Sequence, residues 1–173
     1  ANGGQLIQPR LVMRFTDESH LEQQEFLPVV ERRGVMTPEQ HAQIEDGLLA
    51  VVNAPGGTGK AAYDELLKVA GKTGTAEAAM ARQGASPEVA QWFKGDHAWF
   101  AMYAPVPDPQ VVIVVFVEHG GSGGHDAAPL ARRIFEAWKR LGLYRSPPAD
   151  PDGAGGVILD DDALPRPPEP GEP

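Results

Sequence analysis

The chain of 173 residues is 42% hydrophobic and 23% charged, a composition that supports one globular domain with a buried core. No apolar run approaches the length of a membrane-spanning helix, and the absence of cysteine excludes disulfides and cysteine-ligated zinc. The formal net charge is -9 and no basic stripe is present, which argues against nucleic acid as a partner.

The N-terminal segment predicts a short strand that follows the end of a helix. ANGG (residues 1–4) is typical of a helix that runs into its glycine stop, and the chain begins with neither methionine nor a signal peptide. We therefore expect the chain to be a fragment or a processed product. The apolar segment RLVMRF (residues 10–15) predicts the strand.

A helix is predicted over residues 38–53. Thr37 is suited to the N-cap, Pro38 to the first helical position, and Gln40 completes a capping box. Its expected buried face comprises Ile44, Leu48 and Val51, with His41 beside them as a packed face residue. The segment KAAYDELL (residues 60–67) predicts one or two further helical turns.

Three strands are predicted next, over residues 68–79, 97–104 and 111–119. The last two are joined by PVPDPQ, a linker of hairpin length, so they should pair in antiparallel fashion. Residues 111–117 are apolar without alternation, and we therefore expect both faces of this strand to be covered.

A final helix is predicted over residues 126–142 and should cover one face of the sheet. Its apolar stripe comprises Ala127, Ala131, Ile134, Trp138 and Leu141, with Gly142 as the stop. The expected fold class is α+β, an antiparallel sheet flanked by helices, over residues 1–144. Residues 145–173 are rich in proline, glycine and aspartate and predict a disordered tail; a binding role for its segment VILDDDAL is the less favoured alternative.

Two clusters combine glycine, threonine and lysine, the ingredients of a cradle for an anion. The first, APGGTGKAAY (residues 54–63), fails as a phosphate loop because Ala54 and Ala61 replace the required glycine and hydroxyl residue. It also follows a helix, whereas a phosphate loop follows a strand. A glycine-rich connector is therefore favoured over a nucleotide-binding module.

The second cluster, VAGKTGTAE, lies within a predicted strand. Alternation with period two places Lys72 and Gly74 on one face and Thr73 and Thr75 on the other. Two hydroxyls and a nearby ammonium can hold a carboxylate, and backbone N–H groups at a strand edge can stabilise an oxyanion. An ordinary edge strand whose lysine blocks aggregation explains the same residues equally well.

The order of these segments resembles the C-terminal part of class B penicillin-binding transpeptidases. KTGT resembles the Lys-Thr-Gly motif of the penicillin-recognising serine enzymes, and HAWFAMYAP with VEHGG resembles the elongation-type members, of the penicillin-binding protein 2 type. The resemblance covers roughly residues 1–144. It implies the C-terminal part of the penicillin-binding and serine β-lactamase-like transpeptidase fold.

The resemblance also implies roles for the KTGT residues. Lys72 would supply positive charge and hydrogen bonds near the nucleophile. The hydroxyls of Thr73 and Thr75 would hold the carboxylate of a D-Ala-D-Ala stem peptide or of a β-lactam. The Thr75 N–H would form half of the oxyanion hole, and Gly74 would leave room for substrate along the strand. The family needs neither a metal nor a cofactor.

One part of the family pattern is missing, because none of the serines in the chain begins a Ser-x-x-Lys or Ser-x-Asn motif. The serines are Ser19, Ser86, Ser122 and Ser146. In the family both motifs lie upstream of the segment that begins this chain. We therefore expect the nucleophile to belong to an absent N-terminal half, the chain alone to be inactive in acyl transfer, and that half to be bound to it if the chain is stable.

The resemblance implies a parent protein anchored to the cytoplasmic membrane by one helix, with a periplasmic catalytic domain that cross-links peptidoglycan during cell elongation. Its expected partners are the elongation glycan polymerase of the SEDS family and scaffold proteins. A non-catalytic penicillin-recognising sensor or pseudo-enzyme module would keep KTGT as well, and it remains the alternative.

Other polar and aromatic residues predict no separate site. A metal site could be imagined from scattered polar residues, but their scatter lacks ligand spacing and favours ordinary loop positions. These residues are Asp96, His97, His119, His125 and Asp126. The long segment of residues 81–96 is predicted to be a mobile lid beside the KTGT strand.

Overall fold

The computed structural model describes residues 1–17, 19, 22–78, 84, 86–92 and 95–145. The chain divides into two compact units, Ala1–Ile44 and Glu45–Pro173. Most of the predicted tail and the residues of the predicted lid at 81–83, 85 and 93–94 lie outside the described residues. Of the lid, the short helix α2 (Pro87–Trp92) is described. No helix of the described part combines the length and apolar character needed to cross a membrane.

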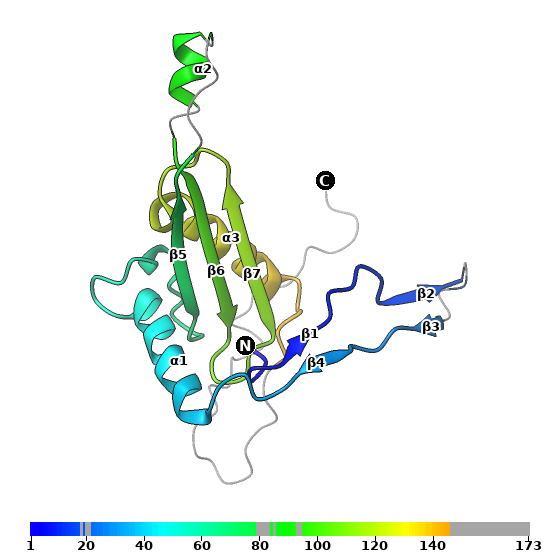
Figure 1. The fold of residues 1–173 in the computed structure, drawn as a ribbon. Coiled ribbons are helices and arrows are strands. Elements are labelled where there is room, and N and C mark those ends of the chain that lie inside the picture. Colours follow the sequence, from blue (N-terminus) through cyan, green and yellow to red (C-terminus); the bar gives the residue numbers. More distant parts are fainter. Residues whose placement is uncertain (18, 20–21, 79–83, 85, 93–94, 146–173) are drawn as a thin grey trace. The chain divides into compact units, whose positions relative to one another are not determined.

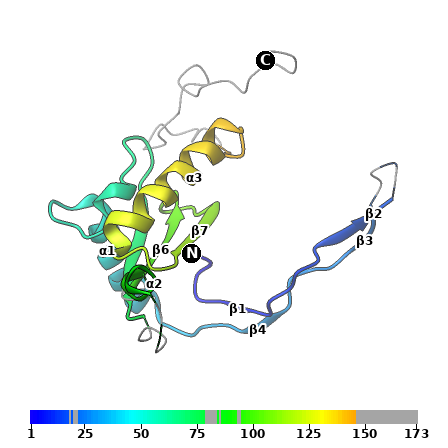
Figure 2. The same ribbon diagram turned by 90° about the horizontal axis from the view of Figure 1, so that it is seen from above.

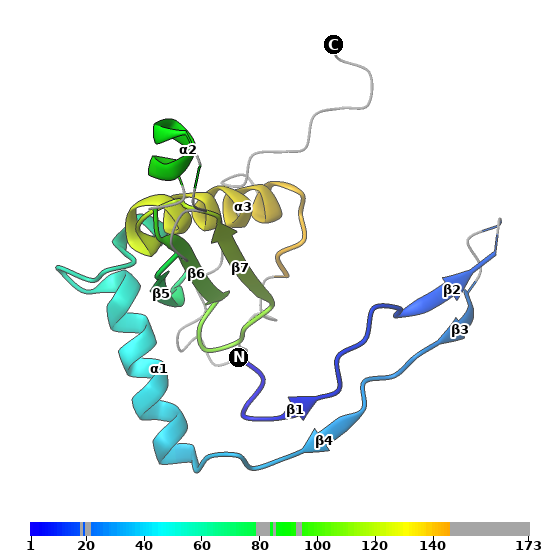
Figure 3. The same ribbon diagram turned by 45° about the horizontal axis from the view of Figure 1, so that its top comes forward.

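The first unit is dominated by a long β-hairpin that is paired in two separate stretches (Figures 1 and 3). Near its base β1 (Leu6–Ile7) pairs with β4 (Val30–Arg32), and farther along β2 (Arg14–Thr16) pairs with β3 (Glu22–Glu25). Between the two stretches, residues 9–12 oppose residues 27–28, so the strands separate there. The prediction of a strand over residues 10–15 is therefore wrong except at its last two residues.

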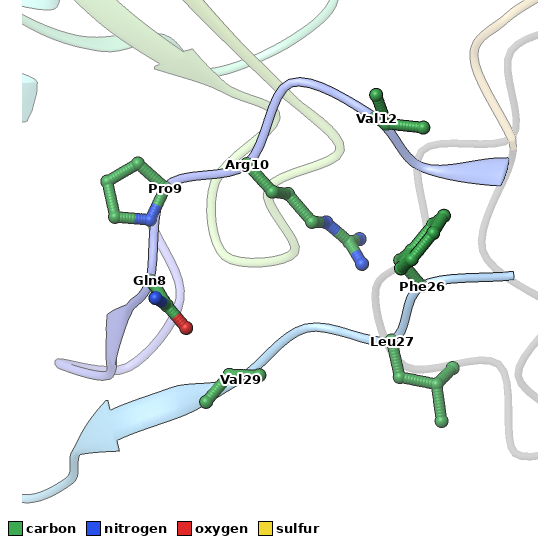
Figure 4. Close-up of a pocket in the computed structure, with 7 residues that line it drawn as sticks. All are labelled: Gln8, Pro9, Arg10, Val12, Phe26, Leu27 and Val29. Atoms are coloured by element: carbon green, nitrogen blue, oxygen red, sulfur yellow. The ribbon is translucent and has the colours of Figure 1, made fainter.

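The separation leaves an opening of about 310 Å³ within the hairpin (Figure 4). Two backbone hydrogen bonds bracket it, from the Gln8 N–H to the Val29 carbonyl at 2.9 Å and from the Phe26 N–H to the Met13 carbonyl at 2.8 Å. Its lining is mainly apolar, with the side chain of Arg10 directed between the two strands.

Helix α1 (Pro38–Asn53) begins and ends where the sequence predicts. The Thr37 N–H donates to Oε1 of Gln40 at 2.9 Å, and the Gln40 N–H donates to Oγ1 of Thr37 at 3.2 Å, which confirms the capping box. The predicted buried face is displaced by one residue. Val52 is fully buried, whereas Ile44 is 51% exposed.

The second unit contains an antiparallel sheet of order β5-β6-β7, formed by β5 (Ala70–Ala76), β6 (His97–Ala104) and β7 (Val111–Val117). Helix α3 (Ala128–Arg140) crosses one face of β6 and β7, as Figures 1 and 2 show from two directions. The expected α+β arrangement is confirmed. Two single turns complete the unit, a 3-10 turn at Lys60–Ala62 and a π-helical turn at Gly123–Ala127.

The core lies between this face of the sheet and α3. Its largest fully buried side chains are Phe100, Phe135, Met102, Val52 and Val69. Of the predicted apolar stripe, Ala127 and Ala131 are fully buried and Trp138 packs against the core, but Ile134 and Leu141 are 49% and 67% exposed. The helix begins two residues later than expected, after the π-helical turn. Phe135, four residues after Ala131 and therefore on the same face, is fully buried in the core. The helix ends near Gly142, whose φ of +67° suits glycine.

The opposite face of the sheet is open in this chain. Val112, Val114 and Phe116 are 61%, 59% and 47% exposed, so the prediction that both faces of this strand are covered is wrong for the described residues. The ring of Trp99 packs against that of Phe116 in a tilted arrangement with centroids 4.5 Å apart, and the two rings form an apolar surface on this face. We call it the open face and the side under α3 the covered face.

Candidate functional site

Strand β5 carries the predicted site residues at one edge of the sheet (Figure 1). Thr73 lies opposite Phe100 and Thr75 opposite Ala98, which places both threonines on the covered face. Lys72 lies opposite Ala101, on the open face. Gly74, opposite Trp99, is on the open face too. The alternation predicted from the sequence therefore agrees with the register of the strand.

A threonine from the first glycine-rich cluster contacts Thr73 of β5. Oγ1 of Thr58 lies 3.0 Å from Oγ1 of Thr73, within hydrogen-bond distance. The two glycine-rich clusters, which sequence reasoning weighed as rivals, thus lie side by side. Both clusters contain a Thr-Gly pair, at residues 58–59 and 73–74, but a match this short does not predict that the two clusters meet.

The Thr58 loop is held at this position by glycines that allow close backbone approach. A Cβ atom on Gly57 would lie 2.3 Å from the carbonyl oxygen of Val51, and one on Gly59 would lie 2.8 Å from the ring of Phe100. The Gly59 N–H donates to the Val51 carbonyl at 2.9 Å. Any other residue at these two positions would displace the loop.

The π-helical turn also packs against Thr58 and β5. A Cβ on Gly124 would lie 2.1 Å from the Thr58 carbonyl oxygen and 3.6 Å from Cγ2 of Thr73. A Cβ on Gly123 would lie 2.5 Å from the Gly74 carbonyl oxygen. Glycines thus bring three segments into contact at β5: the Thr58 loop, the strand itself and the π-helical turn.

The two lysines of the clusters are arranged differently. The Lys72 ammonium donates to the Thr73 carbonyl at 2.7 Å and stays at the strand. The Lys60 ammonium is folded back within its own loop, 3.4 Å from the Asn53 carbonyl and 4.4 Å from the centre of the Tyr63 ring. This position of Lys60 agrees with a connector, the favoured interpretation of the first cluster.

Asp126 organises the π-helical turn beside the site. Its carboxylate accepts the Ser122 N–H at 2.8 Å, and its other oxygen lies 3.0 Å from Nδ1 of His125. The hydrogen bond from the Ser122 backbone, with a smaller effect from His125, holds the pKa of Asp126 below its ordinary value.

His97 and His119, which the sequence leaves as separate loop or strand-end residues, lie together with ring centroids 4.6 Å apart. Nδ1 of His97 accepts the His119 N–H at 3.0 Å, so this nitrogen carries no proton. His119 has a φ of +52°, in the left-handed region. The part of the chain that the structure describes has no cluster of three or more His, Asp or Glu able to hold a metal ion.

The side chains of β5 offer the groups of an anion-binding site. Two threonine hydroxyls and one ammonium lie at a strand edge, and these groups suit a carboxylate. No residue of the printed sequence supplies a Ser-x-x-Lys nucleophile for acyl transfer.

Comparisons with known proteins identify relatives for most of the chain. Residues 1–136 match the family model described as the penicillin binding protein transpeptidase domain. Peptidoglycan D,D-transpeptidase MrdA of Haemophilus influenzae is 42% identical over 93 residues, which are 52% of this chain and 14% of the relative. MrdA of Acinetobacter baumannii is 34% identical over 126 residues, which are 70% of this chain and 18% of the relative.

A solved structure extends the comparison to the fold. Penicillin-binding protein A of Mycobacterium tuberculosis, in a ceftriaxone acyl-enzyme complex, is similar with a TM-score of 0.60 and 27% sequence identity. The similarity covers 79% of this chain and 29% of that protein. The chain therefore spans less than a third of the length of these relatives.

Proposed function

The chain belongs to the penicillin-binding protein transpeptidase family, as the match over residues 1–136 shows, and we propose that it forms one wall of the active site of a peptidoglycan D,D-transpeptidase. The observation that carries this proposal is the arrangement of β5. Its two threonines lie on one face, its lysine on the other, and a glycine stands between them at the edge of the sheet.

Each residue of the wall has a proposed task. The hydroxyls of Thr73 and Thr75 donate hydrogen bonds to the carboxylate of a D-Ala-D-Ala stem peptide, or of a β-lactam that resembles it. The Thr75 N–H contributes to the oxyanion hole. Gly74 lets the substrate backbone approach the strand, and the Lys72 ammonium stabilises negative charge near the nucleophile.

We propose that the nucleophilic serine and its base come from an N-terminal part of the same protein that is not in this chain. The serine oxygen attacks the penultimate D-Ala carbonyl, the terminal D-Ala leaves with a proton on its amine, and an acyl-serine forms. An amine of a second stem peptide then attacks this ester, which makes the cross-link and returns the serine. The family that the chain resembles needs no metal or cofactor for these steps.

The same N-terminal part is proposed to cover the open face of the sheet. Apolar side chains 42 to 61% exposed, such as Trp99 and Val112, are costly to leave in water and typical of a surface that another segment buries. Because Lys72 lies on this face, the covering segment would also bring the nucleophile to the lysine side of β5.

The MrdA relatives are named peptidoglycan D,D-transpeptidases. Assignment to cell-wall elongation and cell shape is supported by the resemblance of the HAWFAMYAP and VEHGG segments to the elongation-type members. The proposed parent has a single membrane-spanning anchor and a periplasmic catalytic domain. Its proposed partners are the SEDS-family glycan polymerase and scaffold proteins of the elongation machinery.

The test is acylation of the full-length protein by a fluorescent penicillin, read on a denaturing gel and as intact mass. We expect rapid labelling that Lys72→Ala and Thr75→Val reduce by an order of magnitude or more, roughly the loss of one or two charge-assisted hydrogen bonds. Thr16→Val, in the exposed β2 strand, is the matched control and should label normally. The isolated chain should not label.

Two outcomes would contradict the proposal. Labelling that is unaffected by the β5 substitutions would remove the threonines and lysine from the site. Penicillin that binds the full-length protein without a covalent adduct would favour a non-catalytic sensor or pseudo-enzyme module.

A further inference from the structure

We infer that Thr58 is a positioning residue that aims the hydroxyl proton of Thr73 at the carboxylate of the substrate. The inference rests on the proposed function, because it assigns a partner to one of the proposed carboxylate-binding groups. Its basis is the 3.0 Å separation of the two Oγ1 atoms, in which either oxygen can be the donor.

The direction of the hydrogen bond between the two hydroxyls decides whether Thr73 can donate its proton to a ligand. A threonine hydroxyl has one proton to donate and lone pairs to accept. When Thr73 donates to Thr58, it presents only lone pairs outward, and these repel an anion. When Thr58 donates to Thr73, the Thr73 proton is free for a ligand. A bound carboxylate therefore selects the arrangement in which Thr58 is the donor.

The donor from Thr58 also strengthens the bond that Thr73 makes. Hydrogen bonds in a chain polarise one another, so a hydroxyl that accepts one bond is a better donor in the next. Without Thr58, the Thr73 hydroxyl would rotate among its staggered positions. The substrate would then have to order it, at a cost in binding entropy.

The surroundings hold Thr58 in place for this task. Gly57 and Gly59 flank it, and both lie too close to neighbouring atoms to carry a side chain. Gly124 lies against its carbonyl oxygen and against the Thr73 methyl group. Thr58 is also exposed, so packing in the core does not explain why a threonine stands at this position.

The experiment measures second-order acylation rates of the full-length protein by intact mass, with benzylpenicillin and with its methyl ester, which lacks the carboxylate charge. Thr58→Val keeps the shape and removes the hydroxyl, whereas Thr58→Ser keeps the hydroxyl. Comparing the two ligands within one variant cancels any loss of folded protein. Thr73→Val, the double variant and the control Thr16→Val complete the set.

We expect Thr58→Val to slow acylation by benzylpenicillin about three- to tenfold, the loss of one hydrogen bond, and to slow the ester much less. Thr58→Ser should recover most of the rate. The double variant should be no slower than Thr73→Val alone, because Thr58 acts through Thr73.

Each contrary result identifies what has failed. If Thr58→Val slows both ligands equally, or slows neither while Thr73→Val slows benzylpenicillin, the inference is overturned and the proposed function stands. If Thr73→Val leaves benzylpenicillin acylation unchanged, the proposed role of Thr73 fails and the inference fails with it.

Discussion

The two faces of the β5-β6-β7 sheet have the same apolar character and opposite environments. On the covered face Phe100 and Met102 are 0% and 2% exposed beneath α3. On the open face Trp99 of β6 and Phe116 of β7 are 42% and 47% exposed. A strand that is apolar on both sides is typical of burial on both sides, as we propose for the full-length protein. It does not indicate which segment buries each one.

The largest difference is expected from matched aromatic truncations on the two faces. Phe100→Ala should lower the free energy of unfolding of the chain by about 3–5 kcal/mol, because it leaves a cavity among fully buried neighbours. Phe116→Ala should cost about 1 kcal/mol, since its ring is already about half exposed and lies against the rings of Trp99 and His97 at the surface.

Denaturant titration of both variants measures the contrast. Equal losses of stability would mean that the open face is buried in solution, for instance between two copies of the chain. In the full-length protein we expect the cost of Phe116→Ala to rise toward that of Phe100→Ala, because the N-terminal part is proposed to cover it.

A second contrast concerns the ion pair that fastens α3 to the covered side. The ammonium of Lys139 and the carboxylate of Asp64 are in direct contact, with the two side chains 11% and 7% exposed. Lys139→Ala would leave the buried Asp64 carboxylate without its countercharge, although the backbone N–H groups of Leu66 and Leu67 would still donate to it. We expect a loss of about 3 kcal/mol on denaturant titration. Arg132→Ala, which breaks the exposed pair with Glu136, should cost about 0.5 kcal/mol or less. A similar cost for both would show that Asp64 regains solvent or another partner.

Glycine substitutions test the close contacts beside β5. Gly124→Ala would put a Cβ 2.1 Å from the Thr58 carbonyl oxygen, and we expect a loss of about 1–3 kcal/mol as the loop shifts. Gly47→Ala, in the middle of α1 with nothing near its Cβ position, should instead stabilise by about 0.5–1 kcal/mol. Thermal unfolding distinguishes the two signs, and a stabilising Gly124→Ala would disprove the close packing.

The sequence predicted correctly the helix and the strand that residues at their own ends determine. The capping box fixed the start of α1. The bounds of β6 (His97–Ala104) match the prediction because Gly95 and Asp96 on one side and Pro105 on the other flank an aromatic-rich run. The hairpin of the first unit was missed, because its strands are short and mostly polar and pair only on either side of an opening. Such pairing depends on partners distant in sequence.

At the site, too, the sequence predicted local geometry but not the contacts between residues distant in the chain. Alternation along β5 predicted which face Thr73 and Thr75 share, since it needs only the period of a strand. The contact from Thr58 could not be predicted that way. It depends on how a loop 15 residues earlier folds back, and three close glycine contacts decide that fold. Phe135 could have been predicted, because it lies four residues after Ala131 and therefore shares its buried face of α3.

The smallest expected effect is on acid stability, through Asp126 in the turn on the covered side. The backbone hydrogen bond from Ser122 lowers its pKa in the folded state below the ordinary 3.8. A carboxyl with a lowered pKa in the folded state stabilises the fold above its unfolded pKa, and this contribution is lost as pH falls through the folded value. Asp126→Asn should therefore reduce stability near neutral pH slightly and flatten its decline below about pH 4. Urea titrations of both proteins between pH 2 and 7 measure this, and parallel curves would show that the Ser122 contact does not favour the charged carboxylate.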